Sequence, residues 1–156
     1  MLNCKKKMNT ITTVVNSEIF KKWHKQEYLI SYYILNQTEN VVFYSKENKK
    51  ATIFTVADTI EMSEDDLFQR KEPEELKLEA VNIDLNNALT IAEEAKERQL
   101  GEEVIEKKII ILSSENHSQW NITYITNTLK MLNIKINAID GNIEKEKVEA
   151  LIALGK

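Results

Sequence analysis

The 156-residue chain is poor in the residues that cross-link or punctuate a fold, with one cysteine, one proline and three glycines. A single cysteine cannot form an internal disulfide, which favours a reducing compartment. Three glycines leave little material for a glycine-rich phosphate loop. One cysteine and two distant histidines give no recognisable zinc-ligand pattern, so we expect neither a metal nor a cofactor.

Long apolar runs are also absent. No stretch approaches the ~20 apolar residues of a membrane-spanning helix, and the basic start is not followed by the roughly 7–15 apolar residues of an export signal. Leu2 and Cys4 superficially match a lipoprotein cleavage site, but that site needs the same apolar segment. We therefore expect a cytoplasmic protein with no membrane partner.

Neither sign of charge is in large excess, because 25 acidic and 21 basic residues are interleaved and give a net charge of −4. Nucleic-acid binding needs a basic surface that neutralises phosphates, so no nucleic-acid partner is expected. The apolar fraction of 42% and the charged fraction of 29% are ordinary for a folded globular protein.

The patterns of charge and hydrophobicity divide the chain into four predicted segments. These are a flexible N-terminal tail (1–15), a short αβββ unit (16–61), an acidic connector around Pro73 (62–83), and a second αβββ unit with a C-terminal helical segment (84–156). Short polar connections between neighbouring strands predict antiparallel pairing. The expected fold class is α+β, an antiparallel sheet packed by helices, with the two units in tandem.

In the first unit, Ser17 can cap a helix that carries Ile19, Phe20 and Trp23 on one face. Strands are predicted from their β-branched and aromatic residues, at 28–35, 41–44 and 51–56.

The second unit has the strongest helix, which Asp84 caps and Gly101 terminates. Its apolar face includes Ala88 and Ala92, whose small side chains let a helix lie close to a sheet. Strands are predicted at 105–112, 120–124 and 132–138. Asp140 and Gly141 predict a type I′ hairpin turn. The apolar residues Val148, Leu151 and Ile152 indicate a short terminal helical segment or a final edge element.

Three segments of this unit form a pattern: the alanine-bearing helix at 88–92 (ALTIA), the strand from Trp120 to Tyr124, and the hairpin at 133–143 (NIKINAIDGNI). Together they resemble the PepSY family, over about 70 residues. The resemblance implies a cystatin-like α+β domain of the kind found in propeptides of secreted peptidases and in standalone proteins. It also implies an inhibitory or binding role, and it brings no catalytic residue.

The sequence offers little for catalysis. A triad needs a nucleophile, a histidine and an orienting acid, yet His24 lies among lysines and His117 in a polar turn. We interpret both as solvated histidines, and the chain as a non-enzyme. Trp120 and Tyr124 could line an aromatic groove, but an alternating stripe more often forms core.

The leading functional hypothesis is a non-enzymatic binding or inhibitory module that recognises a protein or peptide through an exposed sheet face or edge. It rests on a surplus of apolar strand residues with few helices to cover them: Tyr32, Tyr33, Phe43, Tyr44 and Phe54. One alternative is a structural protein that forms a homodimer through the same sheet. A less favoured alternative is a small-molecule enzyme whose scattered site places His117 or His24 beside a buried acid.

Overall fold

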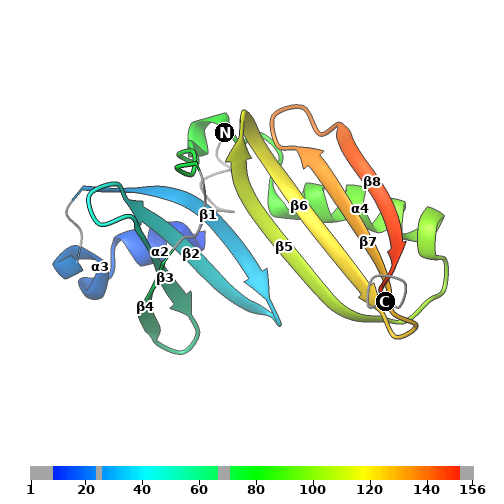
Figure 1. Ribbon diagram of the computed structural model, residues 1–156, viewed down its shortest axis with the longest axis horizontal. Helices are drawn as coiled ribbons and strands as arrows, with labels where there is room; N and C mark the ends of the chain where they lie inside the picture. Colours follow the sequence, from blue (N-terminus) through cyan, green and yellow to red (C-terminus); the bar gives the residue numbers. More distant parts are fainter. Residues whose placement is uncertain (1–8, 24–25, 67–70, 152–156) are drawn as a thin grey trace.

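The computed structural model describes residues 9–23, 26–66 and 71–151 (Figure 1). The described helices are α2 (Asn9–Val15), α3 (Glu18–Trp23), the short 3-10 helix η1 (Leu78–Ala80) and α4 (Leu85–Leu100). The described strands are β1 (Glu27–Leu35), β2 (Thr38–Ser45), β3 (Lys50–Val56), β4 (Ile60–Asp66), β5 (Ile105–Glu115), β6 (His117–Thr126), β7 (Lys130–Asn137) and β8 (Ile143–Ala150).

All these strands form one sheet in the order β4-β3-β2-β1-β5-β6-β7-β8, and every neighbouring pair is antiparallel. Strands β1–β4 and β5–β8 each form a meander. The meanders join where β1 pairs with β5, from Ser31 opposite Ser113 to Leu35 opposite Ile109. The chain is therefore an α+β protein whose antiparallel sheet is packed by helices, which confirms the predicted class.

Helix α4 has the boundaries that its sequence predicted. The Asp84 carboxylate accepts a hydrogen bond from the Asn87 backbone N–H at 2.8 Å, and Gly101 follows the helix with a φ of +58°. Ala88 and Ala92 are fully buried, and α4 lies across β6 and β7 (Figure 1). The small side chains let the helix approach the sheet closely.

All three α-helices cover the same face of the sheet, called here the helix face. One continuous core joins Val14 of α2 and Phe20 of α3 to Ala92 of α4. Trp120 and Tyr124 are fully buried in this core, and each is tied to the helix side by a hydrogen bond. The Trp120 indole N–H donates to the carbonyl of Ile83 at 2.7 Å, and the Tyr124 hydroxyl donates to Glu93 at 2.9 Å.

Two predicted segments have a different structure. Residues 62–66, expected in the acidic connector, belong to β4. Residues 148–150 of the predicted terminal segment are not helical but form the end of β8, in agreement with the alternative of a final edge element. Both are edge strands. An edge strand is held by backbone hydrogen bonds to a single neighbouring strand, and charged side chains there also discourage pairing with another molecule. Its side chains can therefore stay charged and solvated. For these two segments, a high content of charged residues therefore does not exclude a strand.

The N-terminal tail and the last hairpin also differ from the predictions. Residues 9–15 form α2, which buries Ile11 and Val14, while residues 1–8 lie outside the described residues. The connection between β7 and β8 spans residues 138–142, and only Gly141 within it has a positive φ, +83°. A two-residue type I′ turn would need two such residues, so that prediction was wrong. Among the described helices, none combines the length and the apolar character needed to cross a membrane.

Candidate functional site: the open face of the sheet and the β1–β5 split

The structure buries four of the five aromatic residues that were expected to offer a partner-binding surface. Tyr32, Phe43 and Phe54 face the helices, and Tyr44 is buried on the opposite face of the sheet. Tyr33 alone is partly exposed. Four of these side chains are therefore core residues and present no contact surface.

Helices near the N-terminus cover the aromatic residues of the first meander. The ring centroids of Phe20 and Phe43 are 5.0 Å apart, and those of Trp23 and Phe54 are 5.2 Å apart. Helix α2 contacts β2 and β3 beside them. The sequence carries a signal for this burial, because Ile11 and Val14 stand three residues apart within the segment predicted to be a flexible tail.

The opposite face of the sheet, called here the open face, carries no helix in the described parts of the chain. Side chains alternate along a strand, so the neighbours of Trp120 and Tyr124 on β6 point away from α4. Among them, Asn121 and Thr123 are joined to β7, because the Asn133 amide donates to Asn121 at 2.6 Å and to Thr123 at 3.0 Å. Around Asn121, Thr123 and Asn133 of β6 and β7, the open face is thus a hydrogen-bonded polar layer.

In the first meander, the open face is apolar. A second, smaller core there contains Ile30, Val42, Tyr44 and Ala51, and the partly buried Tyr28, Tyr33 and Ile53 pack against it. Burial, and after it the nearby Asp65 carboxylate, raise the pKa of Tyr33. This apolar patch continues across the β1–β5 join, since Tyr33 pairs with Ile111 and Leu35 with Ile109.

Both edges of the sheet are charged. Four of the seven residues of β4 are acidic, and β8 alternates glutamate and lysine from Glu144 to Lys147. Nearly all of these side chains are exposed. Charged edge strands resist pairing with an added strand. The open face is therefore a better candidate for recognition than either edge.

The sheet splits at one end of the β1–β5 join. Pairing stops at Ser31 and Ser113, beyond which β1 pairs only with β2 and β5 only with β6. Residues 71–77, called here the strap, lie in this split. The Leu76 N–H donates to the Leu29 carbonyl at 2.8 Å, and the Tyr28 hydroxyl donates to the Pro73 carbonyl at 2.7 Å.

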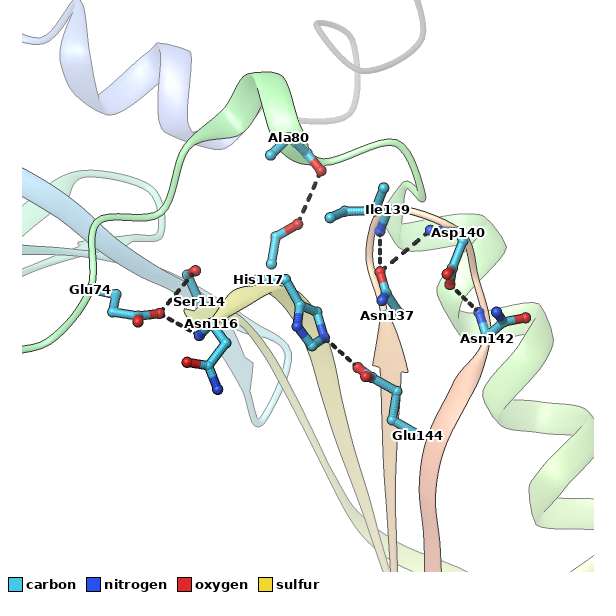
Figure 2. Close-up of polar contacts among 11 residues, drawn as sticks. Glu74, Ala80, Ser114, Asn116, His117, Asn137, Ile139, Asp140, Asn142 and Glu144 are labelled. Atoms are coloured by element: carbon cyan, nitrogen blue, oxygen red, sulfur yellow. Dashed lines mark hydrogen bonds and ion pairs between the residues drawn. The ribbon is translucent and has the colours of Figure 1, made fainter.

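Glu74 ties the other side of the strap to the β5–β6 turn (Figure 2). Its carboxylate accepts the backbone N–H of Asn116 at 2.6 Å and lies 3.4 Å from the Ser114 hydroxyl. Asn116 has a φ of +69°, the left-handed conformation that asparagine tolerates better than most residues. The strap is thus a segment without helix or strand structure that is held between the two meanders.

Two hollows flank the strap. The outer hollow, of about 730 Å³, is lined by Tyr28, Lys46, Glu75, Lys77 and His117 among others. The inner hollow, of about 500 Å³, opens on the open face, with Ile30, Ser31, Ile111 and Ser113 in its lining. Both hollows share Glu72, Pro73 and Glu74 of the strap with Ser114 and Asn116 of β5 and its turn.

His117 lies at the rim of the outer hollow and pairs with Glu144 at 2.6 Å (Figure 2). The Glu144 side chain is 34% exposed, so it is not the buried acid that the enzymatic alternative requires. No described serine, threonine or cysteine is hydrogen-bonded to His117. The neighbouring Ser118 instead donates its hydroxyl to the Ala80 carbonyl at 3.0 Å, and His24 lies outside the described residues.

Glu93 is the most connected acid on the helix face. Burial raises its pKa, but hydrogen bonds from Lys96 and Tyr124 outweigh that effect and leave the pKa of Glu93 lowered. Burial and the hydrogen bond to Glu93 raise the pKa of Tyr124. Within the described ranges, no group of three or more His, Cys, Asp or Glu side chains is arranged to hold a metal ion.

Comparison with known proteins identifies a protein of similar fold but indicates no activity. No protein-family model and no curated protein matches the chain. A solved crystal structure does, that of a "putative lipoprotein" from Clostridium difficile 630. The sequence identity is 16% and the TM-score is 0.62, over 89% of this chain and 92% of that one. At that identity the likeness shows a shared fold alone.

Proposed function

We propose that the chain is a non-enzymatic binding module of PepSY type that recognises a protein or peptide partner through the open face of its sheet. The observation that carries the proposal is the one-sided packing of the sheet. All described α-helices cover the helix face, whereas the open face presents partly exposed Tyr33, Ile53 and Ile111. Apolar side chains on an unpacked sheet face are a common basis for recognition.

The element order supports the finer proposal of two tandem units of the αβββ kind. In each half a helical segment precedes a four-stranded antiparallel meander, and the first strands of the two meanders, β1 and β5, pair with each other. The fourth strands, β4 and β8, are added at the outer edges. The strand that contains Trp120 and the helix that contains Ala88 and Ala92 are those on which the PepSY resemblance rests.

A random-peptide phage library selected on the immobilised protein tests the proposed function. Binding of the selected peptides is then measured by fluorescence anisotropy on three open-face variants, Ile53→Lys, Ile111→Lys and Met131→Lys. Met131 is a partly buried residue of β7 that pairs with Ile125 on the open face of β6. Val104→Lys is the matched control, because Val104 is 60% exposed and precedes β5. We expect at least one face variant to lose about tenfold in affinity, a change of about 1.4 kcal/mol, while the control retains it.

Selected peptides that bind all three face variants as well as the wild type would contradict the proposal. Light scattering, which measures the molecular mass in solution, distinguishes partner binding from the rival hypothesis of self-association. If the open face closes on a second copy, the protein at high micromolar concentration will have the mass of a dimer, and the lysine substitutions will return it to a monomer. A monomer throughout would remove that alternative.

We propose further that the protein acts in the cytoplasm, as the composition predicts. The likeness to a structure described as a lipoprotein makes membrane attachment the rival location. Fractionation of cells that express the natural gene, followed by Triton X-114 phase separation, distinguishes them. The cytoplasmic proposal expects the aqueous phase, and recovery in the detergent phase would refute it.

A further inference from the structure

The inner hollow combines an apolar floor with a polar rim, on the open face where the two meanders meet. Ile30 and Ile111 contribute apolar side chains to it, and Ser31 and Ser113 are paired across the join. Ligand pockets typically combine an apolar lining with a few convergent polar groups. A volume of about 500 Å³ is large enough for an aromatic or long aliphatic side chain.

The rim of the inner hollow is mainly acidic. Among the described residues that line it, Glu72, Glu74 and Glu115 are acidic and Lys71 is basic. Glu74 is engaged by the β5–β6 turn. In the part of the chain that the structure describes, the carboxylates of Glu72 and Glu115 have no hydrogen bond or ion pair, and both residues are exposed. Two carboxylates therefore remain available to a cationic partner.

A neutral polar group lies next to the hollow as well. Gln119 pairs with Ser113 in the β5–β6 ladder and is only 8% exposed. Its side-chain amide is not hydrogen-bonded to any residue of the described ranges. A glutamine amide has a donor and an acceptor and can pair with a peptide bond on both sides. The strap shows that the split already holds a stretch of backbone, because the Pro73 carbonyl and the Leu76 N–H are both hydrogen-bonded to β1.

We infer that the inner hollow takes a large apolar side chain of an extended peptide in which lysine or arginine flanks that residue. The apolar floor would bury the central side chain, and Glu72 and Glu115 would attract its basic neighbours. The acidic residues of β4 would extend the same field along the open face, because Glu61 and Asp65 share the face of Ile53. This inference rests on the proposed function and specifies the chemistry of its partner.

Three fluorescein-labelled peptides test the inference: KRFRK, KRARK and EDFDE, each blocked at its C-terminus. We expect KRFRK to bind the full chain, measured by fluorescence anisotropy. KRARK should bind at least about tenfold more weakly, since an aromatic side chain contributes roughly that much when buried. EDFDE should not bind. Raising the salt concentration should lower the affinity for KRFRK, because salt screens exposed charge pairs, with a Debye length of about 10 Å at 0.1 M.

Variants locate the site. Glu72→Lys combined with Glu115→Lys should lower the affinity for KRFRK at least about tenfold, and Ile111→Ala should remove the preference for KRFRK over KRARK. Glu94→Lys is the matched charge control, because Glu94 is an exposed acid on α4. Circular dichroism checks that each variant is folded, which we expect of the changes at exposed acids and of the truncation of the partly exposed Ile111.

Several results would overturn the inference. They are equal binding of KRFRK and EDFDE, equal binding of KRFRK and KRARK, or a loss in Glu94→Lys as large as in the double variant. No binding of KRFRK also overturns it. Library peptides that depend on Met131 but ignore Glu72 and Glu115 would leave the proposed function standing and refute this inference alone.

Discussion

The assignment of the two sheet faces can be tested with one chemical change made twice on β6. Ile122 is fully buried on the helix face, and Ile125 is partly exposed on the open face three residues later. Replacing each by threonine keeps the β-branched shape and the strand propensity. The two variants therefore differ only in whether the new hydroxyl group enters the core or meets water.

The magnitudes follow from the burial of each site. Loss of apolar volume equivalent to about two carbon groups at Ile122 costs roughly 1.6 kcal/mol, and a buried hydroxyl without a partner adds about 1–3 kcal/mol. We expect Ile122→Thr to lower the free energy of unfolding by about 3–4 kcal/mol. At Ile125 the hydroxyl stays hydrated, so the expected loss is about 1 kcal/mol.

Urea unfolding followed by circular dichroism measures both losses, and an unchanged slope shows that the same surface is exposed on unfolding. For a chain of this size the corresponding shifts in Tm are roughly 6–16 °C for Ile122→Thr and 2–4 °C for Ile125→Thr. Equal losses, or a larger loss at Ile125, would show that the open face is covered and would refute the one-sided packing.

Three further predictions concern stability. Ala92→Leu should cost about 1–3 kcal/mol in urea unfolding, because Ala92 is fully buried between α4 and the sheet and added volume there strains the core. Gly141→Ala should destabilise by about 1–2 kcal/mol in the same assay, since its φ is +83° and a Cβ would meet Ile83 at 3.3 Å. The raised pKa of Tyr124 means that its contribution to stability is complete below the unfolded value of about 10 and is lost as pH rises above it. The lowered pKa of Glu93 means that its contribution is present above the unfolded carboxyl pKa and is lost as pH falls through the folded one. Thermal melts between pH 3 and pH 12 should show both losses, and Tyr124→Phe should weaken the alkaline one.

Local patterns in the sequence predicted the elements whose two faces differ. The span 28–35 became β1 at Glu27–Leu35, and 51–56 lies within β3. Asp84 and Gly101 set the ends of α4 through a side-chain cap and a positive φ, which are local effects of single residues. Such elements carry their own signal, because alternation or helical spacing records which side meets the core.

Edge strands and long-range pairing could not be predicted in the same way. β4 and β8 are exposed on both faces along most of their length, so hydrophobic alternation does not mark them. The β1–β5 join depends on backbone pairing between Ser31 and Ser113, which no local pattern records. Because the sheet is continuous and α2 and α3 cover one of its faces, Phe43 of β2 and Phe54 of β3 are core residues and not the predicted contact surface. The candidate site is instead the inner hollow, which depends on the long-range β1–β5 join.

The β1–β5 join also bears on the order in which the molecule assembles. Within each meander, neighbouring strands are linked by short turns, and their pairing closes only small loops. Pairing of Ser31 with Ser113 must instead close a loop of some eighty residues, and contacts of such large sequence separation slow folding. Each meander can therefore form early, with docking of β1 against β5 as the late step. The strap contacts both sides of the split, so it can be locked in place only after that step, and the inner hollow is among the last features of the fold to be completed.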